Sequence, residues 1–435
     1  MTAPRRMLIP ALLAVPPLLV LAVAALYPTD QLFPNQGDLN LYLDKARAVV
    51  SGAVPYRDLP LEYPPGALVP MVAPYLAWPF GGVDLDAYKW LFAGWEAALL
   101  VVLGWVLMRI VGLGGDAEAP TPRSREARLR RAAVRLIVLT IGAALAITFR
   151  FDLFPALLMA LAVWAALDRR PGLAAVALGL GVLAKLFPVA ILPAIAVPWL
   201  VPLDLRGLVR LGQGFLATLL AGLLPFVALA GSGTTLQFLR YNAERGLQVE
   251  SVGGGLAVLL GLFAGRRVDM DFRFSSVNVD GAFADQWLAL LPVLTIAGFV
   301  SLAWLGWRRV RREAVAAGRV QASTVVELAT VSLLMLLATS KVYSIQYVVW
   351  LVPLAALLGG RRFWLAAALV ALTMPIHPLL YEGLVNQEAL PILVLNARNA
   401  LLVILLAWML WDLARHPSRG GRRAEGGVED GRART

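Results

Sequence analysis

The residues best suited to catalysis lie in the first long polar stretch of the chain. Asp38 immediately precedes residues 39–51, where apolar residues recur at helical spacing, so the sequence predicts an amphipathic helix there. A carboxylate at a helix start is held in one orientation, either to accept a proton as a general base or merely to cap the helix. Glu62 precedes Tyr63-Pro64-Pro65, and prolines hold the chain before them extended. Glu62 is therefore a second fixed carboxylate or an ordinary loop residue.

Later in the chain, charged residues stand at the ends of apolar segments. Arg150 and Asp152 occur in TFRFDLFP, Lys185 in AKLFP, and Lys341 in TSKVYSIQY, which also holds Gln346. Cations gathered near a lipid surface suit a lipid-linked phosphate, and the alternative is that each side chain only extends to the interface. We take Glu62, Tyr63, Gln346 and these charged residues as candidate substrate contacts.

Two further places carry polar candidates. The stretch 231–253 is dense in hydrogen-bonding groups, which suit sugar recognition or any soluble loop equally, and Arg240 is our candidate from it. The other members of this set are Tyr241, Asn242, Glu244, Arg245, Gln248 and Glu250. His377, between Pro375 and Pro378, is a candidate substrate contact or an ordinary interfacial histidine.

The composition shows what kind of molecule must position these residues. Hydrophobic residues make up 59% of the 435, only 15% are charged, and the mean hydropathy is +0.72, whereas soluble domains are about 45–50% apolar and about 25% charged. The sequence therefore predicts an all-α polytopic membrane protein. With no cysteine and two histidines, we expect neither a disulfide nor a metal site or other cofactor.

Apolar periodicity predicts twelve membrane-spanning helices. The first, residues 7–27, is longer than the apolar part of a signal peptide, the alternative for this segment. The others are 87–112, 132–148, 153–167, 171–186, 188–202, 211–230, 283–307, 323–340, 346–360, 363–377 and 389–412.

Basic residues predict the orientation of these helices. Alternating the segments from a cytoplasmic N-terminus puts 26 of the 39 Lys and Arg residues on one side, in short loops and the C-terminal tail. The positive-inside rule makes that side cytoplasmic. The net charge of +11 is thus explained by topology and anionic lipid, and we expect no nucleic-acid partner. Asp38 and the other candidates then fall on the outer side of the cell membrane.

Two apolar stretches are predicted to stay at the outer face. Residues 63–80 are rich in proline and residues 253–265 are too short to cross, so we expect interfacial or re-entrant helices. Residues 1–415 then form one membrane domain, with the site in the outer loop 28–86. The Arg- and Gly-rich tail 416–435 is predicted to be cytoplasmic and disordered.

The order of several short segments resembles a known family. GDLNLY, PYRD, EYPPG, RFDLFPALLMALAVWAALDRR, LGLGVLAKLFPVAILP and KVYSIQYVVWLVP follow one another from Asp38 to Pro353. This order resembles the family-87 glycosyltransferases of the GT-C class, typified by actinobacterial mannosyltransferases that extend phosphatidylinositol mannosides. No nucleotide-binding motif such as a Walker A loop is present.

The resemblance implies a GT-C-like bundle and a reaction. The class keeps its catalytic carboxylate in the first outer loop, a position that Asp38 matches, and uses a polyprenyl-phosphate sugar as donor. The expected activity is inverting transfer of a sugar, foremost mannose, to a glycolipid acceptor. Some members have paired acids where this chain has only Asp38, so a metal is not expected. The alternatives are a pentosyltransferase, such as an arabinofuranosyltransferase, or a transporter or flippase of a lipid-linked sugar, which would show inverted repeats.

The predicted topology is testable because the chain has no cysteine of its own. A single cysteine at Ser51 should react with a membrane-impermeant maleimide in intact cells, and one at Ser124 only after permeabilisation. Labelling of both from the same side would overturn the orientation.

Overall fold

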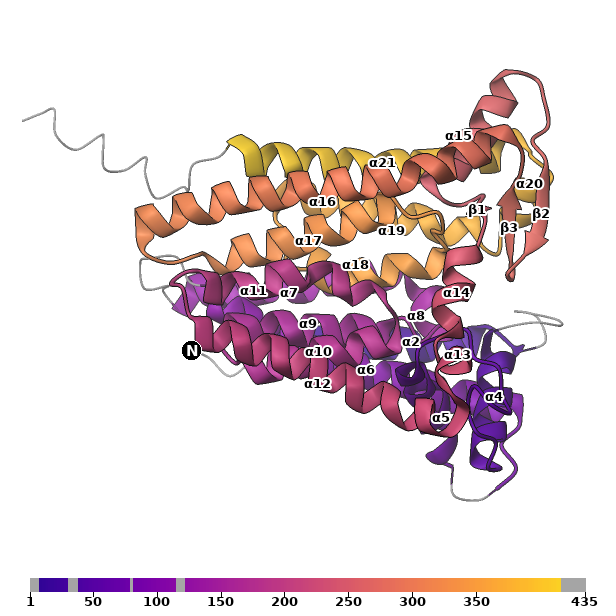
Figure 1. Ribbon diagram of the computed structural model, residues 1–435, viewed down its shortest axis with the longest axis horizontal. Helices are drawn as coiled ribbons and strands as arrows, with labels where there is room; N and C mark the ends of the chain where they lie inside the picture. Colours follow the sequence, from indigo (N-terminus) through magenta and orange to yellow (C-terminus); the bar gives the residue numbers. More distant parts are fainter. Residues whose placement is uncertain (1–7, 30–37, 79–80, 115–121, 416–435) are drawn as a thin grey trace, which may run out of the picture.

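The computed structural model describes residues 8–29, 38–78, 81–114 and 122–415. The predictions for the tail 416–435, and for the parts of the first outer loop at 30–37 and 79–80, lie outside these residues. Long helices run side by side through the molecule, and a smaller group of short helices and strands gathers at one end of them, on the right in Figure 1.

Five helices are long and apolar enough to cross a bilayer, which needs about 20 residues. On α12 and α16 most side chains are exposed although the segments are strongly apolar, as lipid contact requires. The chain is therefore a membrane protein. The five are α2 (Leu8–Leu26), α6 (Leu85–Leu113), α12 (Leu205–Ala230), α16 (Ala282–Ala317) and α21 (Ala389–Arg415).

Shorter helices fill the space between these five. α9 (Leu153–Leu167) is buried on nearly all sides, and α10 (Pro171–Ala184) lies against it and against α12. At Gly179 of α10 a Cβ atom would meet Thr218 at 2.8 Å, so glycine lets α10 and α12 approach closely. The remaining members are α7 (Pro122–Gly142), α8 (Ala144–Phe149), α11 (Leu192–Leu200), α17 (Ala322–Ala338), α18 (Val348–Ala355) and α19 (Gly360–Thr373), with η2 (Phe187–Ile191) and η3 (Ile345–Tyr347) leading into α11 and α18.

Each of the twelve predicted membrane segments coincides with a helix or a pair of helices. The segment predicted at 132–148 is wrong as a single helix, because the chain breaks at Ala143 between α7 and α8. Seven of the twelve lie outside the set that satisfies the length and hydropathy criteria for crossing, so the number of crossings stays a prediction.

The short elements form one end of the molecule, which we call the site end. The predicted amphipathic helix is confirmed as α4 (Asp38–Val50), which buries Leu39, Tyr42, Leu43 and Ala46. The two apolar stretches that were not predicted to cross form η1 (Pro65–Ala67), α5 (Leu68–Leu76) and α15 (Val252–Phe263), all too short to span about 30 Å of hydrocarbon. The other short helices are α13 (Ser232–Thr235), α14 (Gln237–Glu244), η4 (Met374–Ile376) and α20 (Tyr381–Val385).

The site end also holds a small antiparallel sheet that the sequence analysis missed. β1 (Leu247–Gln248), β3 (Ser276–Val279) and β2 (Met270–Arg273) pair in the order β1-β3-β2. Phe274 and Ser275 make the two-residue turn between β2 and β3, each with a φ of 54°. Such turns usually contain glycine or asparagine, and neither residue occurs at these two positions, so this turn cannot be recognised from residue types.

The opposite end of the bundle lies on the left in Figure 1. Because the α16–α17 turn and the starts of α7 and α19 carry arginines there, we call it the arginine end. Arg362 of α19 pairs there with Glu327 of α17 and Asp412 of α21, and Arg312 of α16 donates to the carbonyl of Leu413. The polar candidates of the outer loops and the arginines of the predicted cytoplasmic loops thus lie at opposite ends of one helical body.

Candidate active site

The candidate site lies where several helices end at the site end. Arg150 follows the last residue of α8, Asp152 immediately precedes α9, and Lys185 follows the last residue of α10. Chain breaks at the helix ends place these charged groups together, where Arg150 contacts Asp38 at the start of α4 and Asp152 contacts both Lys185 and Trp350 of α18. The structure brings together Asp38, Arg150, Asp152, Lys185 and Tyr63 from the predicted set.

Asp38 is the first residue of α4, and its carboxylate faces other side chains. Arg150 forms an ion pair with Oδ2, and the Tyr42 hydroxyl donates to the same oxygen at 3.3 Å. The Asp38 side chain is 25% exposed, so it is open to a substrate while held on one side. Its contacts reach well beyond its own helix, which distinguishes it from a residue that only caps α4.

Arg150 connects Asp38 with the other charges. Burial lowers the pKa of Arg150 to about 10, partly opposed by Asp152 and Glu250, so it stays cationic at neutral pH. His377 lies close enough to feel this charge, and both side chains line a small cavity of about 20 Å³ together with Ile345. The structure therefore brings His377 to the rim of the site.

Asp152 and Lys185 form the most deeply buried charge pair of the site. Lys185 Nζ donates to Asp152 Oδ1 at 2.7 Å, and Trp350 Nε1 donates to the same oxygen at 2.5 Å. The Asp152 side chain is 1% exposed, and among the described residues its Oδ2 has no hydrogen-bond partner. One acceptor position of this carboxylate thus remains open to a ligand or a water molecule.

Four aromatic rings surround the ammonium group of Lys185. Its Nζ lies 5.1–5.7 Å from the ring centres, a distance at which a cation is attracted to the ring face. Trp350 also stacks on Phe187 and on Tyr347, each at 3.9 Å. The four rings around Lys185, which we call the aromatic cage, are Tyr63, Phe151, Tyr347 and Trp350.

Arg245 is a cation of the site that our choice of candidates missed. It follows the last residue of α14, lies against the Tyr241 ring and donates to Ser276 Oγ at 3.3 Å. Its charge acts on Lys185, Lys341 and Glu250. We had favoured Arg240, five residues earlier, which is 81% exposed and pairs with Glu244 at 2.6 Å. The sequence held both arginines in one polar loop and gave no sign of which one turns inward.

The remaining candidates lie around this centre. Glu62 is half-buried, and its charge acts on Tyr63, Tyr241 and Lys45. Lys341 Nζ donates to the Ala243 carbonyl at 2.6 Å, and Gln346 accepts from the Ser344 hydroxyl at 2.8 Å. Lys341 is therefore hydrogen-bonded to the backbone at the end of α14, and Gln346 to a neighbouring side chain, in this structure.

The arrangement combines two chemical capacities. Arg150, Lys185 and Arg245 supply positive charge that is partly screened from water, which favours a bound phosphate. Asp38 supplies a partly exposed carboxylate beside them, and a carboxylate held in this way is suited to accept a proton from a hydroxyl. In the part of the chain that the structure describes, no three His, Asp or Glu side chains gather as a metal site would require, and our expectation that no metal is held stays a prediction.

The buried Glu250 makes the stability of the folded protein depend on pH. Burial raises the pKa of Glu250 to about 7, against the opposing charges of Arg398, Arg150 and Arg245. Because the folded protein binds this proton more tightly than the unfolded chain, the stability that it contributes is complete below about pH 4.5 and is lost as the pH rises through about 7.

We therefore expect the melting temperature of the wild type to fall relative to that of Glu250→Gln between pH 5 and pH 8. Tryptophan fluorescence of each purified protein measures its melting temperature. Glu244→Gln, at an exposed position of the same loop, is the control and should track the wild type. Parallel curves for the wild type and Glu250→Gln over this range would contradict the assignment.

Comparison with known proteins gives little further guidance. No family model matches the chain, and no curated protein matches it. Among solved structures, it is similar to the crystal structure of the Archaeoglobus fulgidus oligosaccharyltransferase in the apo form, with 12% sequence identity and a TM-score of 0.45. The match covers 95% of this chain and spans 56% of the archaeal one.

Proposed function

We propose that this protein is a membrane glycosyltransferase that moves a sugar from a polyprenyl-phosphate donor to a glycolipid acceptor at the outer face of the cell membrane. The observation that carries the proposal is the partly exposed Asp38 carboxylate, paired with Arg150, whose charge and that of Arg245 both act on the buried Lys185. A base beside a phosphate-binding cluster is what transfer from a sugar phosphate to a hydroxyl needs.

In the proposed reaction, Asp38 acts as the base and polyprenyl phosphate is the leaving group. Asp38 accepts the proton of the acceptor hydroxyl as its oxygen attacks the anomeric carbon of the donor. The bond between that carbon and the phosphate oxygen breaks, and polyprenyl phosphate leaves with the electron pair. Attack opposite the leaving group inverts the anomeric centre, by analogy with inverting glycosidases. Phosphate is a competent leaving group, so the reaction needs no strong general acid.

The cations are proposed to bind the donor phosphate. Arg150 is placed to exchange its contact with Asp38 for a phosphate oxygen, which would free the carboxylate for the acceptor. Lys185 and Arg245 would balance the charge that grows on the phosphate as the bond breaks. Binding these charges away from bulk water strengthens each interaction.

The finer assignment rests on the sequence resemblance. The resemblance to family-87 enzymes favours mannose as the sugar and a phosphatidylinositol mannoside as acceptor, with an arabinofuranosyl or other pentosyl donor as the main rival. The outer position of the site rests on the distribution of arginines, which places the arginine end in the cytoplasm.

The donor assay tests the proposal directly. Purified protein, radiolabelled polyprenyl-phosphate mannose and a membrane lipid extract should give a labelled glycolipid. GDP-mannose in place of the lipid donor should give none. Turnover with GDP-mannose alone would contradict the lipid-donor assignment. Movement of the labelled donor across vesicles without any transfer would instead indicate a flippase.

Asp38 is the sharpest single test of the mechanism. Asp38→Asn keeps the size of the side chain but removes its basicity, so we expect turnover to fall by about 10²–10⁴-fold with the protein still folded. Asn caps a helix about as well as Asp, so a cap would survive this change, and only Asp38→Ala would lower helix stability.

Asp44→Asn is the matched control, because Asp44 is on the same helix and 72% exposed. It should leave turnover unchanged. Near wild-type transfer by Asp38→Asn would exclude Asp38 as the base and make Glu62 the next candidate. Loss of donor binding by Asp38→Asn would assign Asp38 to substrate positioning.

A further inference from the structure

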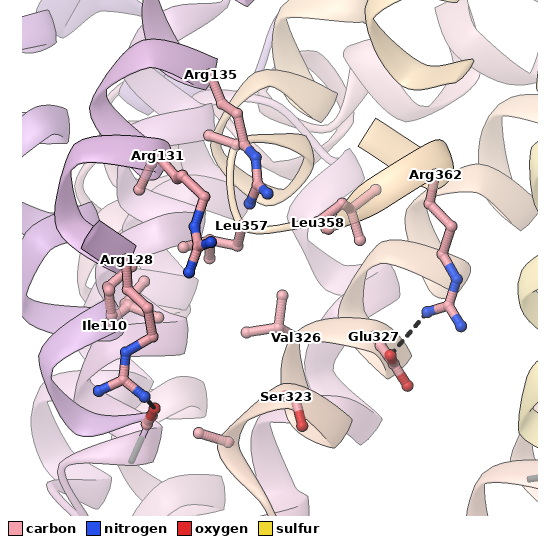
Figure 2. A pocket seen from close by; sticks show the side chains of 16 residues that line it. Ile110, Arg128, Arg131, Arg135, Ser323, Val326, Glu327, Leu357, Leu358 and Arg362 are labelled. Carbon is pink, nitrogen blue, oxygen red and sulfur yellow. Dashed lines mark hydrogen bonds and ion pairs between the residues drawn. The ribbon is translucent and has the colours of Figure 1, made fainter. Parts of the chain in front are cut away.

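A second polar cavity lies at the arginine end, far from the candidate active site. Its volume is about 380 Å³, within the range of about 300–1,000 Å³ that is usual for small-ligand pockets. Figure 2 shows its walls, which come from the end of α6, the middle of α7, the start of α17, the link between α18 and α19 and the first turn of α19. Nothing in the proposed transfer reaction uses this cavity.

Three arginines of α7 give the cavity its charge. Arg128, Arg131 and Arg135 recur at the spacing that places side chains on one helix face, and all three line the cavity (Figure 2). Arg362 lies across from them, but it is paired with Glu327 at 2.8 Å and with Asp412. In the described ranges none of the three α7 arginines has an ion-pair partner, although Arg135 lies over the Phe363 ring at 5.4 Å, and the Glu327 carboxylate that also lines the cavity is already paired with Arg362.

Unpaired hydrogen-bond donors point to an acceptor that belongs there. Arg128 Nη1 donates to the Gly114 carbonyl at 3.0 Å, but its Nε and Nη2 atoms are buried and have no partner among the described residues. Buried polar atoms in proteins are almost always hydrogen-bonded. Gly359, the residue before α19, also lines the cavity, and no side chain of the described residues caps that helix, whereas the start of α17 already has the Glu313 carboxylate, which accepts from the backbone N–H of Gln321. Helix N-termini favour anions.

The apolar residues of the lining favour an anion that also carries an apolar part. Ile110, Val326, Leu357 and Leu358 form apolar walls beside the guanidinium groups (Figure 2). A small inorganic anion gains nothing from such walls, whereas a phosphate diester attached to a glycerol backbone gains contact on both sides. The cavity also lies at the end of the bundle that the arginine distribution assigns to the cytoplasmic leaflet, where anionic lipids are abundant.

We propose that this cavity binds the phosphate of an anionic phospholipid headgroup, held by Arg128, Arg131 and Arg135. The proposal does not depend on the transfer reaction, since it concerns the opposite end of the molecule. The shared chemistry is a phosphate ester, which a soluble phosphate would also present, and the test separates the two sources.

The experiment titrates the purified full chain in detergent micelles with dioctanoyl phosphatidylglycerol and follows binding by the melting temperature and by calorimetry. Dioctanoyl phosphatidylcholine has the same tails without net charge, and glycerol 3-phosphate and inorganic phosphate test the soluble source. We expect phosphatidylglycerol to bind and to stabilise the protein, and phosphatidylcholine to do neither at the same concentration.

Arg131→Gln and Arg135→Gln should each weaken the binding of phosphatidylglycerol about tenfold or more, because each removes one charged donor. Arg130→Gln is the matched control: it removes the same charge from the same helix, and Arg130 is exposed like Arg131 but does not line the cavity. It should bind like the wild type. Arg131 pairs with no described carboxylate, so Arg131→Gln should melt normally without lipid.

Each outcome decides the proposal. Binding of glycerol 3-phosphate that displaces phosphatidylglycerol and is lost in Arg131→Gln would support the phosphate site and assign its ligand to the soluble phase. Equal binding of phosphatidylcholine, or equal weakening by Arg130→Gln, would overturn the proposal, because the interaction would then reflect detergent partitioning or net charge alone. Transfer activity is not part of the readout, so failure here leaves the proposed function untouched.

Discussion

The buried pair of Asp152 and Lys185 is the interaction on which the site end depends. Removing two charges from water costs several kcal/mol per ion, and the pair is stable only because other groups satisfy it. Trp350 supplies a second hydrogen bond to Asp152, and the aromatic cage surrounds Lys185. Removing either partner would leave the other charge buried alone, which typically costs about 3–5 kcal/mol. The pair therefore fixes the ends of α9 and α10 to the start of α18.

From this pair a chain of contacts reaches the proposed base. Tyr63, which precedes η1, belongs to the cage and packs edge-on against Phe151 at 5.2 Å. Phe151 in turn contacts Tyr42 at 5.4 Å, and Tyr42 donates to Asp38. The position of the loop carboxylate is thus set by rings that pack on the buried pair. On the other side, the fully buried Arg398 of α21 donates to the Glu250 carbonyl at 2.9 Å and lies 3.9 Å from the Tyr343 ring centre, which joins the β1–α15 connection to the bundle.

Much of this arrangement is readable from the sequence, and what is not has a physical reason. Helical periodicity predicts α4 and the helices of the bundle because burial on one face leaves a pattern in the residues. The alternation of segments assigns Asp38, Arg150, Lys185 and Arg245 to one end. The direction in which a side chain points at a helix end leaves no such pattern. Arg240 and Arg245 are therefore equivalent in the sequence, although in the structure Arg240 is exposed and Arg245 lies at the site. The cage around Lys185 joins residues from three distant segments, and the Phe274-Ser275 turn adopts a conformation that its residue types do not favour.

Cations at the two ends of the bundle differ in the groups that they interact with. At the site end Arg150, Lys185 and Arg245 are each engaged by a carboxylate, a hydroxyl or an aromatic ring. At the arginine end the three α7 residues that line the cavity have no ion pair with a described carboxylate: Arg128 donates to the Gly114 carbonyl and Arg135 lies over the Phe363 ring, while Glu327 on the opposite wall is paired with Arg362. Counting charges on each side of the membrane predicts orientation and treats all arginines alike. Burial and ion pairing distinguish the arginines from one another. A cation that is already paired with a carboxylate must exchange that contact to bind a substrate. A cation without such a pair can keep a bound anion. Reversible binding of a donor phosphate therefore suits the site end, and retention of a lipid suits the arginine end.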